Sequence, residues 1–290
     1  MSERIRPVVQ VATATEAIEG GGFTVRRPFS TVDLSVTDPF LLLDEMGPVE
    51  YGPGEAKGAP DHPHRGFETV TYVLDGAMEH RDSTGGGGVI RAGDTQWMTA
   101  GAGLVHSEMP LADMLRDGGR MHGLQLWVNL PRAEKLTPPR YQLLRGDELT
   151  VVRDDDAGTT LRIIAGRVGE HEGPGKTHSP ITYAHASLRA GARLDVPWEP
   201  EFNALVYVLS GVARVAGEAV GAGQLAVLGA GDRVAVDAGT DVEAVLLGGK
   251  PLREPIAWYG PFVMNTRAEI VEAVDDYEAG RLGRIAPLNA

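Results

Sequence analysis

The sequence predicts an all-β protein built from two similar β-barrels in tandem, followed by a short C-terminal helix. The 290 residues include 38 glycines and 19 prolines, with only 6% aromatics, which favours many short strands joined by tight turns. The stretch Thr69-Val-Thr-Tyr-Val-Leu-Asp-Gly76 returns as Ala204-Leu-Val-Tyr-Val-Leu-Ser-Gly211, with Tyr, Val, Leu and Gly in register. A repeat of whole-domain size indicates two copies of one fold.

The repeat and the C-terminal pattern define the expected domains. We expect a first barrel over residues 1–134, a second over residues 135–265, and a helix with its tail over residues 266–290. Thr266-Arg-Ala-Glu269 has the form of a capping box, and Gly280 suits the position just after a helix. Between them an apolar stripe predicts that the helix packs against a barrel, and it comprises Ile270, Val271, Val274 and Tyr277.

Composition excludes several classes of function. The net charge is −13 and no Lys/Arg cluster is present, so the chain would repel the phosphates of nucleic acids. There is no cysteine, which excludes disulfides, thiolate zinc sites and cysteine nucleophiles. The first residues lack the apolar run of a signal peptide, and no apolar stretch is long enough to cross a bilayer. We expect a cytoplasmic monomer that binds neither membranes nor nucleic acid directly.

Two short segments carry metal-ligand residues at alternate positions. The first contains His62 and His64, and the second contains His106 and Glu108. In an extended chain, residues i and i+2 point to the same face. Three nitrogens and one oxygen that converge inside a barrel suit a divalent first-row metal. The alternative is that His-Pro-His is merely a polar turn before a strand.

The same alternation predicts where neighbouring residues point. If no bulge intervenes, the face of His62 and His64 continues through Glu68, Val70, Tyr72 and Leu74. His80 and Asp82 are expected on a strand surface rather than in the site. Trp97 and Trp127 are expected in the core.

The second barrel is predicted to lack the metal. With the repeat as register, His62, His64 and Glu68 fall on Pro197, Glu199 and Asn203, and His106 and Glu108 fall on Val236 and Ala238. Because none of these positions keeps the ligand set, the sequence predicts one metal per chain, in the N-terminal barrel.

These motifs resemble the pirin family of the cupin superfamily. The similar stretches are His62 to Tyr72 (His-Pro-His-Arg-Gly-Phe-Glu-Thr-Val-Thr-Tyr), Gln96 to Gly101, His106 to Pro110, Leu124 to Pro131 and Gly260 to Thr266. The resemblance spans nearly the whole chain and implies two jelly-roll cupin barrels. It also implies one mononuclear iron held by His62, His64, His106 and Glu108. Glu68, which is a ligand in many other cupins, would then be a hydrogen-bonding or structural residue.

The resemblance implies more than one function. The first is a quercetin 2,3-dioxygenase that opens a flavonol with O₂, with Glu108 as general base. Its metal would be Fe(II), with Ni, Cu, Co, Mn or Zn as alternatives. The second is a non-enzymatic, metal-dependent regulator that binds a transcription factor or a metabolic enzyme. A cupin isomerase or small-acid dioxygenase would use the same ligands but lacks the whole-chain resemblance.

Overall fold

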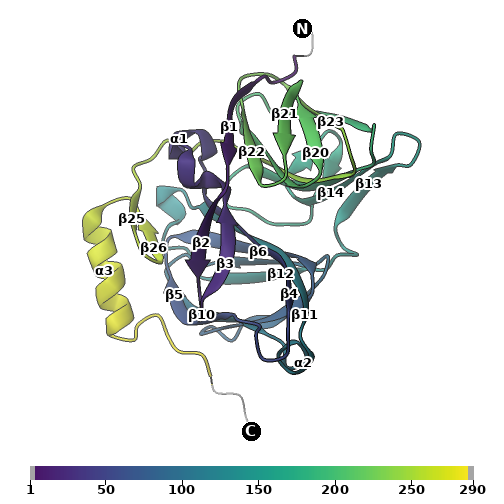
Figure 1. Ribbon diagram of the computed structural model, residues 1–290. Coiled ribbons are helices and arrows are strands. Elements are labelled where there is room, and N and C mark those ends of the chain that lie inside the picture. Colours follow the sequence, from purple (N-terminus) through teal and green to yellow (C-terminus); the bar gives the residue numbers. More distant parts are fainter. Residues whose placement is uncertain (1–3, 287–290) are drawn as a thin grey trace. The chain divides into compact units, whose positions relative to one another are not determined.

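A computed structural model describes residues 4–286 and confirms a mostly β chain with two barrels and a C-terminal helix (Figure 1). Each compact unit is assembled from three separate stretches of chain. The first barrel comprises residues 16–26, 42–147 and 253–286. The second barrel comprises residues 4–15, 27–41 and 148–252.

The first barrel contains a seven-stranded sheet, a four-stranded sheet and a two-stranded hairpin. The seven strands lie in the order β12 (Arg140–Leu144), β9 (Thr95–Thr99), β6 (Phe67–Asp75), β11 (Gly119–Asn129), β4 (Phe40–Tyr51), β3 (Phe23–Arg27) and β2 (Thr15–Glu19). The four lie in the order β5 (Ala59–His64), β10 (Leu104–Pro110), β7 (Ala77–Asp82) and β8 (Gly87–Arg91). The remaining elements are α2 (Ala112–Asp117), a 3₁₀ turn (Arg132–Glu134), β25 (Ala257–Tyr259), β26 (Phe262–Met264) and α3 (Arg267–Glu278).

The second barrel repeats this plan. Its seven strands lie in the order β1 (Val8–Thr13), β22 (Gln224–Leu228), β19 (Asn203–Ser210), β24 (Val242–Gly249), β17 (Ile181–Leu188), β14 (Thr159–Ala165) and β13 (Thr150–Asp154). Its four lie in the order β18 (Arg193–Pro197), β23 (Arg233–Ala238), β20 (Val212–Val215) and β21 (Glu218–Gly221). The remaining elements are a 3₁₀ turn (Pro28–Thr31), α1 (Leu34–Thr37), β15 (Arg167–Val168) and β16 (His171–Glu172).

The compact units differ from the continuous segments 1–134, 135–265 and 266–290 expected from the sequence. Strand β1 belongs to the second barrel because it pairs with β22. Strand β12 extends the first barrel past residue 134 because it pairs with β9. Hairpin β25–β26 and helix α3 then return to the first barrel. Long-range strand pairing, which local sequence patterns do not encode, causes this exchange of segments.

Helix α3 begins and ends as its sequence predicts. Thr266 is the N-cap, and its side chain and that of Glu269 form both bonds of the capping box. Gly280 follows the helix with a φ of +73°. The helix packs on the first barrel through a cluster that includes Ile270, Ala273 and Val105. The apolar stripe was partly wrong, because Val271 is 54% exposed and Tyr277 is 41% exposed. No helix within residues 4–286 is long and apolar enough to cross a membrane.

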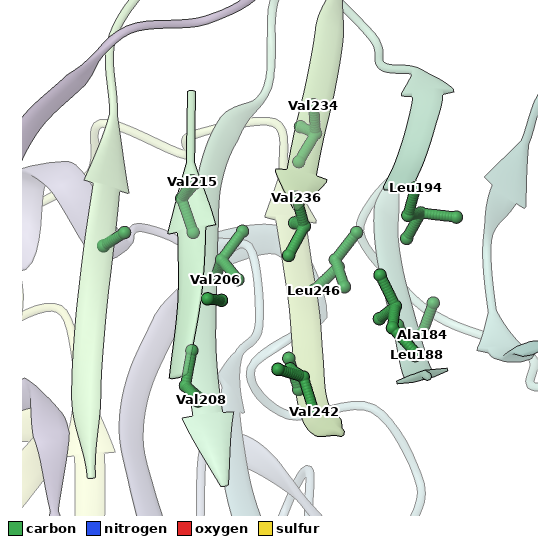
Figure 2. Close-up of a cluster of buried hydrophobic side chains, with 14 of the residues drawn as sticks. Ala184, Leu188, Leu194, Val206, Val208, Val215, Val234, Val236, Val242 and Leu246 are labelled. Carbon is green, nitrogen blue, oxygen red and sulfur yellow. The ribbon is translucent and has the colours of Figure 1, made fainter. Parts of the chain in front are cut away.

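Aliphatic side chains fill the interior of the second barrel. Figure 2 shows Leu194, Val206, Val236 and Leu246 among them. Leu194 pairs with Val236 as His62 pairs with His106 in the first barrel.

Strand pairing therefore corrects the register of the repeat. The positions equivalent to His62 and His64 are Leu194 and Val196, not Pro197 and Glu199. The shift arises because the loop between β18 and β19 is longer than the loop between β5 and β6. In either register the ligand set is absent from these positions.

We predict that Leu246→Ala lowers the free energy of unfolding by roughly 2–5 kcal/mol, because it opens a cavity among closely packed side chains. Leu246 is fully buried. The matched control is Val212→Ala at a 51% exposed position, with an expected change within about 0.5 kcal/mol. Urea denaturation followed by circular dichroism measures both, and equal effects would contradict the described core.

Candidate metal centre

Strands β5 and β10 bring three histidines together in the first barrel. His62 is the cross-strand partner of His106, and His64 is the partner of Leu104. The imidazole centroids of His62 and His106 lie 4.2 Å apart, and His64 lies 4.8 Å from each of them. One nitrogen from each ring lies within 4.8 Å of the other two. The structure thus has the convergence of histidines that the alternate spacing predicted.

Backbone carbonyls fix the proton position on two of these rings. His62 Nδ1 lies 2.7 Å from the carbonyl oxygen of Pro60, and His64 Nδ1 lies 3.2 Å from that of Pro261. A carbonyl oxygen only accepts hydrogen bonds, so Nδ1 must donate and the Nε2 lone pair of the neutral ring stays free. His64 Nε2 is buried and has no hydrogen-bond partner.

The buried rings are held in the neutral form. Burial lowers the pKa of His64 well below its ordinary value, and the neighbouring His62 adds to this effect. Burial, followed by the proximity of His64 and His62, does the same for the pKa of His106. The Nε2 atom of His106 is also buried without a hydrogen-bond partner. Neutral imidazoles with free lone pairs are the form that binds metals.

Glu108 lies beside His106 but in a second group of side chains. The pairing of β10 with β5 shifts register between His106 and Glu108, and on β7 the partner of Glu108 is His80. Its ligand oxygen lies within 4.8 Å of nitrogens of both His106 and His80. Glu108 Oε1 accepts hydrogen bonds from Thr71 Oγ1 (2.8 Å) and Gln96 Nε2 (3.2 Å). His106 is therefore shared by two groups of ligand atoms.

The expected continuation of the His62 face through Glu68, Val70, Tyr72 and Leu74 was wrong. Gly66 interrupts the alternation with a φ of +90°, and a Cβ there would lie 2.0 Å from the Val263 carbonyl oxygen. After this break Thr71, rather than its neighbours, reaches Glu108. Glu68 is fully buried and accepts a 2.7 Å hydrogen bond from Thr99, as the structural role implied by the family resemblance requires.

The expected strand-surface positions of His80 and Asp82 were also wrong. His80 is fully buried and Asp82 is 4% exposed. The His80 ring stacks on Tyr141 at 5.1 Å and lies 5.1 Å from the His106 ring. A signal was available, since both residues share strand parity with the apolar Met78.

An aromatic wall adjoins the histidines. Trp97 is core, as predicted, but Trp127 is only half-buried. Its ring lies 5.2 Å from His64, 4.3 Å from Phe67 and 5.7 Å from Trp258. Trp258 is 38% exposed. Trp127 therefore joins the histidine cluster to aromatic surface that water reaches.

The C-terminal stretch of the chain braces the site. The Pro261 carbonyl bonds the His64 ring. Asp276 of α3 accepts a 2.7 Å hydrogen bond from the Arg65 guanidinium, which also donates to the Ala102 carbonyl. Lys135 Nζ donates to the carbonyls of Gly66 and Val263 and to Asn129. The turn after His64 is thus fixed to elements far away in sequence.

Within residues 4–286, the groups of side chains that could hold a metal ion both include His106 of the first barrel. Two cupin barrels with one candidate metal centre define a bicupin protein. The family model described as "Pirin" matches residues 22–128, and the "Pirin C-terminal cupin domain" matches residues 183–283. A "Pirin-like protein" of Caulobacter vibrioides is 42% identical over 279 residues, which cover 96% of this chain and 99% of that protein. The chain belongs to the pirin family.

Solved structures agree with this assignment. A crystal structure of quercetin 2,3-dioxygenase from Acinetobacter baumannii is 38% identical, with a TM-score of 0.92 and coverage of 98% of this chain and 100% of that one. The bacterial pirin YhhW of Escherichia coli, solved in complex with nickel(II), is 22% identical with a TM-score of 0.62. It covers 83% of this chain and 99% of its own, and at that identity it supports the fold alone.

The lowered pKa values of His64 and His106 predict a pH-dependent stability of the metal-free protein. Below about pH 6.5 the unfolded chain takes up protons on these rings while the folded rings stay neutral. The free energy of unfolding therefore falls as the pH drops from about 6.5 towards the lowered folded values. Each ring adds up to about 1.4 kcal/mol per pH unit to this slope.

Urea denaturation of chelator-treated protein at several pH values measures the slope, and His64→Gln should make it shallower. An unchanged slope in the variant would contradict a neutral, buried His64.

Proposed function

We propose that the first barrel binds one divalent first-row metal through His62, His64, His106 and Glu108. The observation that carries the proposal is that three imidazoles converge with each Nδ1 in a hydrogen bond, while Nε2 of His64 and of His106 is buried without a hydrogen-bond partner. Both hydrogen bonds to Glu108 fall on Oε1, which leaves Oε2 for the cation. Three nitrogens and one oxygen suit iron(II), the metal we propose, and would also accept nickel, copper, cobalt, manganese or zinc.

We further propose that the metal-loaded protein is an oxygenase of the quercetin 2,3-dioxygenase type. A relative of known structure at 38% identity carries that name. The half-buried face of Trp127, next to His64, suits the planar rings of a flavonol. A bound metal would supply open coordination positions and would lower the pKa of a bound flavonol hydroxyl.

Glu108 is proposed as the general base for that hydroxyl. If its bond to the metal loosens, the Glu108 carboxylate can accept the proton as the flavonol binds. Thr71 and Gln96 hold the carboxylate through Oε1, so the orientation of Oε2 is fixed before substrate arrives. Phe67 and Trp127 present apolar aromatic surface beside His64, which suits the rings of the substrate.

A second candidate is a regulator that binds another protein and senses the state of the metal. Trp258 is 38% and Tyr259 69% exposed, and exposed aromatic residues are enriched at protein interfaces. Both lie on the hairpin whose Pro261 carbonyl binds His64. Protein that binds metal stoichiometrically but leaves quercetin unchanged would favour this candidate.

We predict that iron-loaded protein consumes O₂ with quercetin and bleaches the visible band of the flavonol. Glu108→Gln, which removes the base but keeps the shape, should lower kcat by about 10²- to 10⁴-fold. An oxygen electrode and absorption spectroscopy measure both rates, with metal content determined for each preparation.

The matched control is Glu172→Gln, at an exposed position in the second barrel, which should retain full activity. Full metal occupancy without oxygen uptake would sink the dioxygenase proposal. Equal loss in both variants would contradict the role of Glu108.

A further inference from the structure

We propose that His80, supported by Asp82, is a positioning residue that holds His106 in the tautomer with a free Nε2. This inference rests on the proposed metal centre, of which His106 is a ligand. Whereas His62 and His64 bond backbone carbonyls, the Nδ1 atom of His106 contacts a side chain. The neighbouring imidazole of His80 takes that place.

The three side chains form a continuous buried row across two strands. His106 on β10 pairs with Asp82 on β7, and His80 lies two residues before Asp82 on the same face. His106 Nδ1 lies 3.3 Å from His80 Nδ1, and His80 Nε2 lies 3.4 Å from Asp82 Oδ2. His80 and His106 are both fully buried, so water cannot replace either contact.

The carboxylate determines the direction of the hydrogen bonds. An ionised carboxylate only accepts, so His80 Nε2 must carry a hydrogen. With its single hydrogen on Nε2, the His80 ring has a lone pair on Nδ1, and across the 3.3 Å contact His106 Nδ1 is then the donor. A neutral His106 with a hydrogen on Nδ1 leaves Nε2 unprotonated, and that atom is the one without a hydrogen-bond partner.

Asp82 is held ionised and fixed in orientation. Its Oδ1 accepts hydrogen bonds from Thr84 N (2.8 Å), Thr84 Oγ1 (2.6 Å) and Gly86 N (3.0 Å). Burial acts to raise the pKa of Asp82, but hydrogen bonds from His80, Thr84 and Gly86 outweigh it and lower the pKa to about 2. The contact between His80 and the Tyr141 ring, stacked at 21°, fixes the His80 plane.

The second barrel supports this role independently. Strand pairing makes Val236 the equivalent of His106, and Ala213 and Val215 the equivalents of His80 and Asp82. All three are fully buried aliphatic residues. The copy without metal ligands therefore also lacks the His–Asp pair, as expected if the pair serves the ligand.

Asp82→Asn provides the sharpest test because it is isosteric. The backbone N–H groups of Thr84 and Gly86 require an acceptor at the Oδ1 position, so the amide nitrogen must face His80. That nitrogen donates, which reverses each hydrogen bond along the row and puts the His106 hydrogen on Nε2. The control is Glu79→Gln, the same chemical change on the opposite face of β7.

Two measurements follow on each protein. Long-range ¹H–¹⁵N spectra of metal-free protein, with His106 assigned through His106→Gln, report its tautomer. Competition with a chelator gives the Zn²⁺ affinity. Wild type and Glu79→Gln should carry the His106 hydrogen on Nδ1. Asp82→Asn should carry it on Nε2 and bind Zn²⁺ about 10- to 100-fold more weakly.

Several outcomes would overturn the proposal: a wild-type His106 protonated on Nε2, an unchanged Zn²⁺ affinity in Asp82→Asn, or a His80 nitrogen that shifts as a ligand on Zn²⁺ addition. If Asp82→Asn does not fold, His80→Phe keeps a ring against Tyr141 but removes the acceptor, and it should also weaken Zn²⁺ binding. Wild-type protein that binds no Zn²⁺ contradicts the metal centre instead, while the tautomer in metal-free protein still decides the role of His80.

Discussion

A buried imidazole can bind a cation only if the nitrogen that faces it carries no hydrogen, and this requirement governs the first barrel. Three acceptors satisfy it, one for each ring. They come from the start of strand β5 (Pro60), from the C-terminal hairpin (Pro261) and from strand β7 (His80). Segments far apart in sequence must therefore assemble before the three lone pairs converge.

One of the exchanged segments contributes directly to this arrangement. Residues 253–286 return to the first barrel, where they supply the Pro261 carbonyl, the Asp276 partner of Arg65 and the aromatic ring of Trp258. A first barrel that ended near residue 134 would lack the acceptor for His64. The C-terminal helix is thus a brace of the site as well as a cover for Val105 and its apolar neighbours.

The two barrels share one plan of strand pairing but place different kinds of side chain in their interiors. Thr71 pairs with Gln96 and Gln125 in the first barrel, and the equivalent Val206 pairs with Ala226 and Leu246 in the second. Aliphatic burial stabilises a barrel at roughly 25 cal/mol per Å², whereas buried polar groups cost free energy unless each has a partner. The second barrel has an interior suited to stability, and the first accepts buried polar groups whose open nitrogens suit a cation.

The sequence predicted what depends on local periodicity. Alternate spacing identified the convergence of His62, His64 and His106, the repeat identified two barrels, and the capping box identified α3. Glu108 as fourth ligand remains a prediction. The sequence missed what depends on long-range pairing or a single backbone break: the placement of β1 and β12, the reversal of face at Gly66, the burial of His80 and Asp82, and the carbonyl of Pro261. No short window of residues contains that information.

Anomalous diffraction from crystals of iron-loaded protein, collected on both sides of the iron edge, would locate the cation relative to the three imidazoles. We expect one peak per chain, in the first barrel, within bonding distance of Nε2 of His62, His64 and His106. A peak in the second barrel, or one bound through Nδ1 of any of these rings, would contradict it.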